Sequence, residues 1–144
     1  MPEVSLLHLD PELPLPSYAR PGDAGLDLLA REGAMVHAGG GRAMVPTGIA
    51  LAIPEGWAGF VLPRSGLSWK HGITIVNAPG LIDAGYRDEI KVLLLNTDPA
   101  HHYEVHRGDR IAQLVIMRVE AVTLARVDGF AGDHRGGGFG STGR

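Results

Sequence analysis

Residues 77–96, NAPGLIDAGYRDEIKVLLLN, carry the clearest structural pattern in the chain. Turn signals at Pro79-Gly80 and Ala84-Gly85 flank the short apolar step Leu81-Ile82, and an apolar run of strand length follows from Ile90 to Leu95. Apolar runs this short are typical of β-strands when glycine and proline interrupt them. The stretch therefore predicts a hairpin.

One carboxylate, Asp83, lies just before the second turn of this hairpin. A loop residue beside a rigid strand pair suits chemistry, because the strands fix its position while the loop leaves it open to a ligand. An aspartate before Ala-Gly can equally shape the turn, since its side chain readily bonds the backbone two residues on. Residue type and position are compatible with both interpretations.

Short strands are expected on either side of this stretch. Prolines at positions 11, 14, 16 and 21 exclude a helix there. Apolar runs that Gly and Pro interrupt predict strands over residues 4–9, 25–30, 34–36, 43–45, 48–53, 57–62, 73–78, 89–96, 103–105, 110–119 and 122–127. Many short strands at this spacing indicate an all-β barrel or sandwich, which we place in a single domain over residues 1–128.

The only helical turn expected is SGLSWKH, residues 65–71. Ser65 is placed to cap its start, and Gly72 is placed to end it. The N–H groups at such a helix start, together with Ser65 and the preceding Arg64, could also bind an anion. The sequence is compatible with a plain helix cap and with an anion site.

Composition narrows the classes of function. The chain has 144 residues and no cysteine, which excludes disulfides, zinc ribbons and thiol nucleophiles and fits a reducing cytoplasm. No segment approaches the run of about 20 apolar residues that a membrane-spanning helix needs. A formal net charge of −3 gives no overall field for nucleic acid or anionic membranes. We therefore expect a cytoplasmic protein whose partners include neither nucleic acid nor a membrane.

Residues 129–144, GFAGDHRGGGFGSTGR, differ in character from the rest of the chain. They carry too little apolar surface to offset about 1–2 kcal/mol of backbone entropy per ordered residue. A frayed terminus is one interpretation. The other is a flexible arm that orders over a nucleotide, with Arg135 as a phosphate fork, Phe139 as a flat face and glycine N–H groups close to an anion.

Two further features have competing interpretations. Gln113 interrupts an otherwise apolar run, and it can be a satisfied core amide, an outward-facing strand residue or a ligand contact. His102 and His106 are four residues apart, but no helical pattern surrounds them and a third ligand is missing. We expect these histidines to lie in surface loops and not to form a zinc site.

Taken together, the motifs of this chain resemble those of the trimeric dUTP pyrophosphatases, the dUTPase family. The matching segments are DAGLDL at 23–28, PRSGLSWKHGI at 63–73, NAPGLIDAGYRDEI at 77–90, GDRIAQL at 108–114 and GGFGSTG at 137–143. No single motif is decisive, but together they lie in the family's order across nearly the whole chain. The resemblance implies a jelly-roll-like, distorted β-barrel and a homotrimer whose active sites are shared between subunits.

The reaction that the resemblance implies is the Mg²⁺-assisted hydrolysis of dUTP to dUMP and pyrophosphate, by attack of water on the α-phosphorus. Such an enzyme supplies dUMP for thymidylate synthesis and keeps uracil out of DNA. Asp83 matches the family's catalytic aspartate, which orients and deprotonates the water. Asp27 matches the residue that holds Mg²⁺ through water, and one carboxylate suffices because Mg²⁺ takes its other ligands from phosphates and water.

The resemblance also implies three sets of substrate contacts. Phosphate contacts fall to Arg64, Ser65, Gly66 and Gln113. Contacts with uracil and deoxyribose fall to the hairpin, through Asn77, Gly80, Leu81, Ile82, Asp83, Tyr86 and Lys91, with the Tyr86 ring under the deoxyribose. The arm contributes Arg135, Phe139, Gly140, Ser141 and Thr142, with Phe139 stacked on uracil. The chain has one residue fewer between Arg135 and Phe139 than the family pattern, which puts the contact of Arg135 with the γ-phosphate in question.

Two other classes of function share this fold. A sister branch deaminates dCTP, but the presence of Asp83 and of a full glycine arm argues against it. A trimer that binds nucleotide or a protein without catalysis is the other alternative, since a fold can outlive its chemistry. The intact set of Asp27, Asp83 and Tyr86 argues against that alternative.

Overall fold

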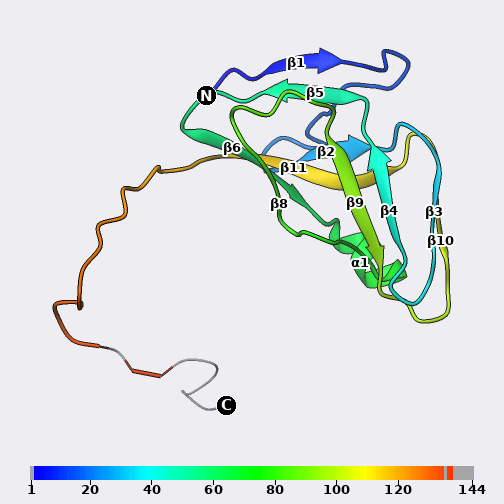
Figure 1. Cartoon of the computed structure of the whole chain (residues 1–144). Helices are drawn as coiled ribbons and strands as arrows, with labels where there is room; N and C mark the ends of the chain where they lie inside the picture. Colours follow the sequence, from blue (N-terminus) through cyan, green and yellow to red (C-terminus); the bar gives the residue numbers. More distant parts are fainter. Residues whose placement is uncertain (1, 135, 138–144) are drawn as a thin grey trace.

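The computed structural model describes residues 2–134 and 136–137, which form strands and one short helix (Figure 1). The helix α1 spans Ser65–His71. The strands are β1 (Ser5–His8), β2 (Leu26–Leu29), β3 (Ala34–Val36), β4 (Arg42–Pro46), β5 (Ile49–Ala52), β6 (Trp57–Leu62), β7 (Ile73–Ile75), β8 (Gly80–Ile82), β9 (Lys91–Asn96), β10 (Tyr103–Val105) and β11 (Arg110–Arg118). The prediction of an all-β chain with a single helical turn is confirmed.

The strands pair antiparallel in four small sheets. The largest has the strand order β2-β11-β6-β8, the next has the order β4-β9-β7, and β1-β5 and β10-β3 form two-stranded sheets. Neighbours within a sheet come from distant parts of the sequence, as in β11 against β2 and β6. This crossing of the chain between facing sheets is the jelly-roll-like arrangement that the motifs imply (Figure 1).

The core lies between the sheets, and β9 shows how the sequence builds it. Val92 and Leu94 point inward and are at most 1% exposed, whereas Leu93 and Leu95, which alternate with them, are half-buried. Side chains of a strand alternate between its faces, so a run of leucines supplies both the core and a second, partly covered surface. Burying each aliphatic side chain stabilises the fold by about 1.5–3 kcal/mol.

The predicted hairpin over residues 77–96 is wrong in its pairing. β8 pairs with β6, while β9 pairs with β4 and β7, so the two strands of the stretch belong to different sheets. The reason lies in Gly59, which faces Ile82 across the ladder; an added Cβ there would lie only 3.0–3.3 Å from three side chains. The glycine lets β8 lie close on β6. The turn at Ala84-Gly85 is confirmed, because the Tyr86 N–H donates to the Asp83 carbonyl over 3.1 Å.

Two smaller expectations at strand and helix ends also need correction. The strand predicted over 73–78 ends at Ile75, because the Ala78 N–H donates to the Ile75 carbonyl and turns the chain. Arg64 occupies the N-cap position of α1, without a side-chain hydrogen bond, and Ser65 is the first helical residue. Gly72 ends the helix as predicted, with φ 65° and its N–H donating to the Ser68 carbonyl.

The strand predicted over residues 122–127 does not form in this chain. The segment is extended and exposed, with Val122 at 77% and Leu124 at 91% exposure. A strand needs a neighbour to satisfy its N–H and C=O groups, and among the described residues none pairs with this segment. In Figure 1 the chain after β11 accordingly runs away from the body.

A clamp of charged side chains fastens the N-terminal segment to the body. Arg107 donates to both carboxylate oxygens of Asp10, over 2.6 and 3.0 Å, and also to the Arg31 carbonyl over 2.7 Å. The Nε of Arg31 lies 3.3 Å from the same carboxylate. The hydrogen bond from Arg107 is the main reason why the pKa of Asp10 is lowered to about 2.

We expect Asp10→Asn to lower the melting temperature at neutral pH by an amount that disappears in acid. A carboxylate whose pKa falls on folding stabilises the native state above its ordinary pKa of 3.8, and this stabilisation is lost as the pH falls toward 2. Thermal unfolding of both proteins across this range checks the sign. Glu12→Gln is the control, because its side chain is 90% exposed and should contribute little. An equal difference in melting temperature at neutral pH and near pH 2 would contradict the assignment.

Candidate active site

A polar pocket of about 430 Å³ lies on one face of the β2-β11-β6-β8 sheet. The register places Gln113 opposite Asp27 on one side and opposite Leu62 on the other, so these three side chains lie in one row across the sheet. The loop after β6 adds Arg64, Ser65 and Gly66 to the lining. Five of the predicted site residues thus come together, namely Asp27, Arg64, Ser65, Gly66 and Gln113.

The charged residues that line this pocket are two arginines, Arg64 and Arg110, and two aspartates, Asp27 and Asp23. The Nε of Arg64 lies 3.3 Å from Oδ1 of Asp27, and Nη1 of Arg110 donates to Oδ2 over 3.3 Å. Nη1 of Arg64 also donates to the Arg110 carbonyl over 2.9 Å. The two arginines keep several guanidinium N–H donors beside these contacts, and guanidinium donors suit a phosphate chain. Sequence reasoning missed Arg110, although its place at the head of the GDRIAQL motif was a usable signal.

The Gln113 side chain lies between Pro63 and Gly25 in the lining of the polar pocket. Its Nε2 donates to the Pro63 carbonyl over 2.9 Å, and its side chain is half-buried. A Cβ added at Gly25 would lie 2.8 Å from its Oε1 and 3.2 Å from its Cβ. Gln113 is therefore an outward-facing strand residue that lines the pocket, one of the three interpretations its position allowed. The close approach explains why residue 25 has no side chain.

We expect Gly25→Ala to lower kcat/KM for dUTP, the substrate that the motifs imply, by roughly tenfold, because the new methyl group displaces the Gln113 amide from its place in the pocket. Steady-state kinetics of the single variants and of Gly25→Ala combined with Gln113→Ala check this. In the background without the amide, the alanine should cause a much smaller further loss, because only the 3.2 Å contact with the Cβ of residue 113 remains. Independent, multiplicative losses in the double variant would contradict the contact.

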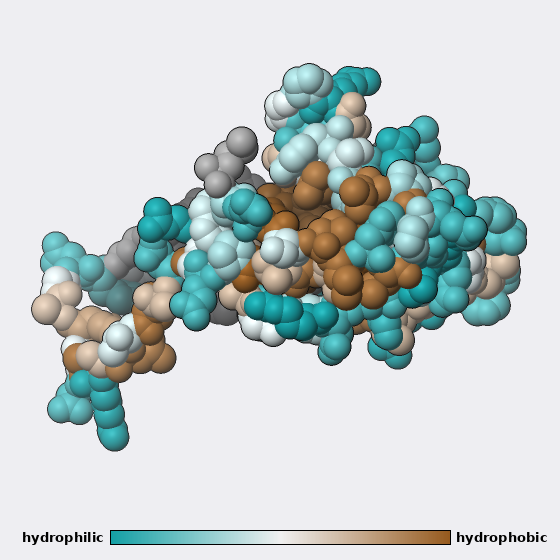
Figure 2. Space-filling model, turned by 90° about the horizontal axis from the view of Figure 1, so that it is seen from above, coloured by the Kyte–Doolittle hydropathy of each residue, from teal (hydrophilic) through white to brown (hydrophobic). Residues whose placement is uncertain are grey.

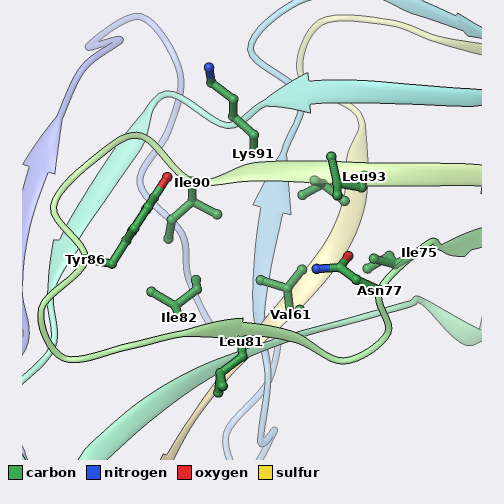
Figure 3. A pocket seen from close by; sticks show the side chains of 11 residues that line it. Val61, Ile75, Asn77, Leu81, Ile82, Tyr86, Ile90, Lys91 and Leu93 are labelled. Atoms are coloured by element: carbon green, nitrogen blue, oxygen red, sulfur yellow. The ribbon is translucent and has the colours of Figure 1, made fainter.

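A second, smaller cavity of about 180 Å³ opens between β8 and β9 (Figure 3). Its lining includes the predicted residues Asn77, Gly80, Leu81, Ile82, Tyr86 and Lys91. In Figure 3 the Asn77 amide and the Tyr86 ring border the space, and the apolar walls are Val61, Ile82 and Ile90. The side chains of Leu81 and Lys91 point away from it, so these two residues can contribute mainly through their backbone. A small cavity that combines apolar walls with polar groups suits a flat heterocycle.

Asp83 stands at the edge of this second cavity. It is exposed and directly follows Ile82, whose side chain lines the space. The turn after it is closed by its main-chain carbonyl, and none of the described residues donates a hydrogen bond to its carboxylate. The interpretation that the Asp83 side chain shapes the turn is therefore not supported.

The two pockets lie on opposite sides of the same sheet. Leu62 lines the polar pocket and its neighbour Val61 lines the smaller cavity, and successive side chains of a strand point to opposite faces. The ladder supports this, since Val61 faces Gly80, whereas Leu62 faces Gln113. A single copy of the chain therefore does not bring the arginines and the Asn77 cavity to one ligand.

The remaining predicted residues divide into two groups. Arg135, Phe139, Gly140, Ser141 and Thr142 lie outside the described residues. His102 and His106 are exposed, as expected for surface loops, and His102 accepts a hydrogen bond from the Ala38 N–H over 2.9 Å. Over residues 2–134 and 136–137, no cluster of three or more His, Asp and Glu side chains could hold a metal ion. In the same part of the chain, no helix is long and apolar enough to cross a membrane.

Comparison with known families and with curated relatives points to the same family. The family model described as dUTPase matches residues 11–143. Among relatives, the deoxyuridine 5′-triphosphate nucleotidohydrolase of Thermobifida fusca is 61% identical over 97% of this chain and 78% of its own length. The protein of the same name from Mycobacterium tuberculosis is 55% identical over 97% of this chain and 94% of its own length.

Solved structures agree with the sequence comparison. A dUTPase variant of Staphylococcus bacteriophage 80alpha with dUpNHpp superposes with a TM-score of 0.89 at 26% identity, over the whole of both chains. A dUTPase variant of phage phi11 of S. aureus superposes with a TM-score of 0.81 at 25% identity, over 90% of this chain and 99% of the other. That structure is described as showing the coordination of a structural Mg(II) ion.

Proposed function

We propose that this chain, which belongs to the dUTPase family, hydrolyses dUTP to dUMP and pyrophosphate. The observation that carries the proposal is the sorting of the matched motifs into two complementary pockets. One has Arg64, Arg110 and Gln113 available for a phosphate chain. The other has Asn77 and Tyr86 around a small cavity, and Asp83 directly follows its lining residue Ile82. Together these are the two halves of a site for a nucleoside triphosphate.

In the proposed reaction, the Asp83 carboxylate accepts a hydrogen bond from a water molecule and takes its proton as the water oxygen attacks the α-phosphorus. The bond from the α-phosphorus to the bridging oxygen breaks, and that oxygen leaves with pyrophosphate. Negative charge moves toward the leaving group during the reaction. Arg64, the Ser65 hydroxyl, the Gly66 N–H and the Gln113 amide would stabilise this charge from the polar pocket.

Structures of the family point to a divalent metal ion, and we propose that Mg²⁺ is the ion used by this chain. The donor set fits, because Asp27 is the half-buried carboxylate of the polar pocket and each of its oxygens keeps a second lone pair beside its arginine. The described residues provide no cage of several ligands, which agrees with an ion held mostly by phosphate oxygens and water. When bound, the ion would offset the charge of the triphosphate. Asp27 would orient it through a water molecule.

Selection of the nucleoside would depend on the smaller cavity. The uracil edge would be read by the Asn77 amide and by the backbone groups of Gly80, Leu81, Ile82 and Lys91. Cytosine would present a hydrogen-bond donor to these groups where uracil presents an acceptor. Buried polar groups left unpaired make such a mismatch costly. The Tyr86 ring would pack under the deoxyribose and leave no room for a 2′-hydroxyl.

We propose that the active enzyme is a homotrimer with shared sites. Because the sheet separates the two pockets of one chain, a complete site needs the polar pocket of one copy against the Asn77 cavity of another. Such a contact joins different surfaces of identical chains, and contacts of this kind close into a ring when the rotation between neighbours divides a full turn evenly, as it does in a trimer. Each subunit of a ring would then contribute to two sites.

Exposed apolar surface supports association between copies. A groove lined by Leu6, Leu26, Leu51, Trp57, Leu114 and Ile116 is open on the single chain. Seen from above, apolar residues gather in a hollow on the body, beside the extended C-terminal segment (Figure 2). Patches of this kind mark interaction sites. We propose that the exposed segment 122–127 gains its missing strand partner from a neighbouring subunit.

We propose that residues 1–128 form the catalytic domain and that residues 129–144 form a flexible arm that closes over the site. In that arm Phe139 would stack on uracil, while Arg135 with Gly140, Ser141 and Thr142 would hold the outer phosphates. A cytoplasmic location and the lack of a nucleic-acid partner likewise stay predictions.

Hydrolysis of dUTP in ¹⁸O-labelled water tests the reaction and the position of attack. We expect dUMP and pyrophosphate as the only products, with the label in dUMP, because the water oxygen joins the α-phosphorus. Mass spectrometry of both products reads the outcome. Label in pyrophosphate would place the attack on the β-phosphorus, and release of inorganic phosphate would replace the proposed reaction by a stepwise one.

A further inference from the structure

We infer that Glu89 is a positioning residue that sets the place of the Tyr86 ring, and through it the rejection of a 2′-hydroxyl on the substrate. The inference rests on the proposed function of the same site. Glu89 lines neither of the two pockets, and the motifs assign no role to it. Its contacts nevertheless join the loop that carries Tyr86 to the turn between β4 and β5.

The Glu89 carboxylate is held in a fixed place on the turn between β4 and β5. Its Oε1 accepts a hydrogen bond from the Gly48 N–H over 2.8 Å and another from Nη1 of Arg31 over 3.2 Å. The side chain is only 17% exposed. A carboxylate that accepts both a main-chain N–H and a guanidinium has little freedom to move, because charge-assisted hydrogen bonds are short and directional.

The main-chain carbonyl of Glu89, held in place by these contacts, binds the Tyr86 side chain. The Tyr86 hydroxyl donates to the Glu89 carbonyl over 3.0 Å. The next residue is docked on the same turn, since the Ile90 N–H donates to the Ile49 carbonyl over 2.9 Å and the Thr47 hydroxyl donates to the Ile90 carbonyl over 2.7 Å. In Figure 3 the hydroxyl end of the Tyr86 ring lies beside Ile90, above the cavity.

Arg31 extends this anchor to a second charged residue. Besides Glu89 it contacts Asp10, whose carboxylate is itself held by two nitrogens of Arg107. The loop that carries Tyr86 is thus tied through Glu89 to both the N-terminal segment and the turn before β11. Because this frame is formed by strands and charge pairs, a change at Glu89 should move the ring without removing any group that contacts the substrate.

The test is the ratio of kcat/KM for dUTP to kcat/KM for UTP, measured for wild type, Glu89→Ala, Glu89→Asp and Glu89→Gln. We expect the ratio to fall about tenfold in Glu89→Ala, because a ring that shifts by about 1 Å no longer excludes the 2′-hydroxyl. Glu89→Asp keeps the charge but shortens the reach by one methylene, so it should show an intermediate fall. Glu89→Gln keeps an oxygen acceptor for the Gly48 N–H and should stay within about threefold of wild type.

Matched controls separate positioning from stability. Glu104→Ala removes an exposed glutamate from β10 and should leave the ratio unchanged. A wild-type ratio in folded Glu89→Ala and Glu89→Asp, even with a lower melting temperature, would show a structural role only and overturn the inference. If Glu89→Ala does not fold, Glu89→Asp decides in the same way. If wild type prefers dUTP over UTP and the Glu89 variants keep the same ratio, only this inference is overturned. If wild type does not hydrolyse dUTP, the proposed function is overturned.

Discussion

Asp83→Asn is expected to abolish dUTP hydrolysis, with a loss of 10²-fold to 10⁴-fold or more, while dUTP still binds within about threefold of wild type. The amide has nearly the shape of the carboxylate but cannot accept the proton of the attacking water. The carboxylate has no donor among the described residues that its loss would leave unpaired, so the substitution should not disturb the turn. Pyrophosphate release measures turnover, and isothermal titration with dUTP and Mg²⁺ measures binding.

Asp88→Asn is the matched control for this prediction. Asp88 is exposed on the same loop, five residues further on, and lines neither pocket. Its amide variant should keep wild-type turnover. Equal losses of turnover in Asp83→Asn and Asp88→Asn would show that negative charge on the loop is needed, and not a base at position 83. Full activity of Asp83→Asn would show that this residue takes no part in the reaction.

Mixing two inactive variants should restore activity. Arg64→Ala removes a cation from the polar pocket, and Asp83→Asn removes the base beside the smaller cavity. If each site takes its arginines from one chain and Asp83 from another, random assembly from equal amounts gives about one intact site in four. Coexpression or joint refolding of the two variants, followed by pyrophosphate release, measures the recovered fraction. Each variant alone should stay at its low rate.

The control for the mixing experiment is a chain that carries both substitutions, combined with wild type. Its sites are intact only where both contributing chains are wild type, again about one in four for equal amounts. Recovery in the first mixture shows that the two groups act across chains. A first mixture that stays as inactive as its components would place Arg64 and Asp83 of one chain in the same site, against the separation of the pockets by the sheet.

Most of the fold could be predicted from the sequence, because short strands between Gly and Pro carry their own signals. β6, α1 and β10 have the predicted boundaries, and the αL glycine that ends the helix is at Gly72. Pairing was harder. The stretch after Asn77 reads locally as a hairpin, but β8 joins β6 because Gly59 leaves room for it. Local pattern carries no information on such a distant neighbour.

The site shows the same division between local and distant information. The motifs identified five residues of the polar pocket and six of the smaller cavity but missed Arg110. The orientation of Gln113 could be fixed only by the register of β11 against β2 and β6. The exposed run at 122–127 has strand composition but no partner within the chain, so its pattern predicts a strand that one copy alone cannot form. The role of Glu89 was invisible in sequence, because its partners Arg31 and Gly48 lie more than 40 positions away.

A single substrate panel tests the proposed function. Wild-type protein is incubated with dUTP, dCTP, dTTP and UTP, each with and without Mg²⁺, and both pyrophosphate and ammonia are measured. We expect Mg²⁺-dependent pyrophosphate from dUTP alone and no ammonia from any substrate. Ammonia from dCTP would contradict the proposal and indicate a deaminase. Neither pyrophosphate nor ammonia from any of the four nucleotides would also contradict it and indicate a protein that binds without catalysis.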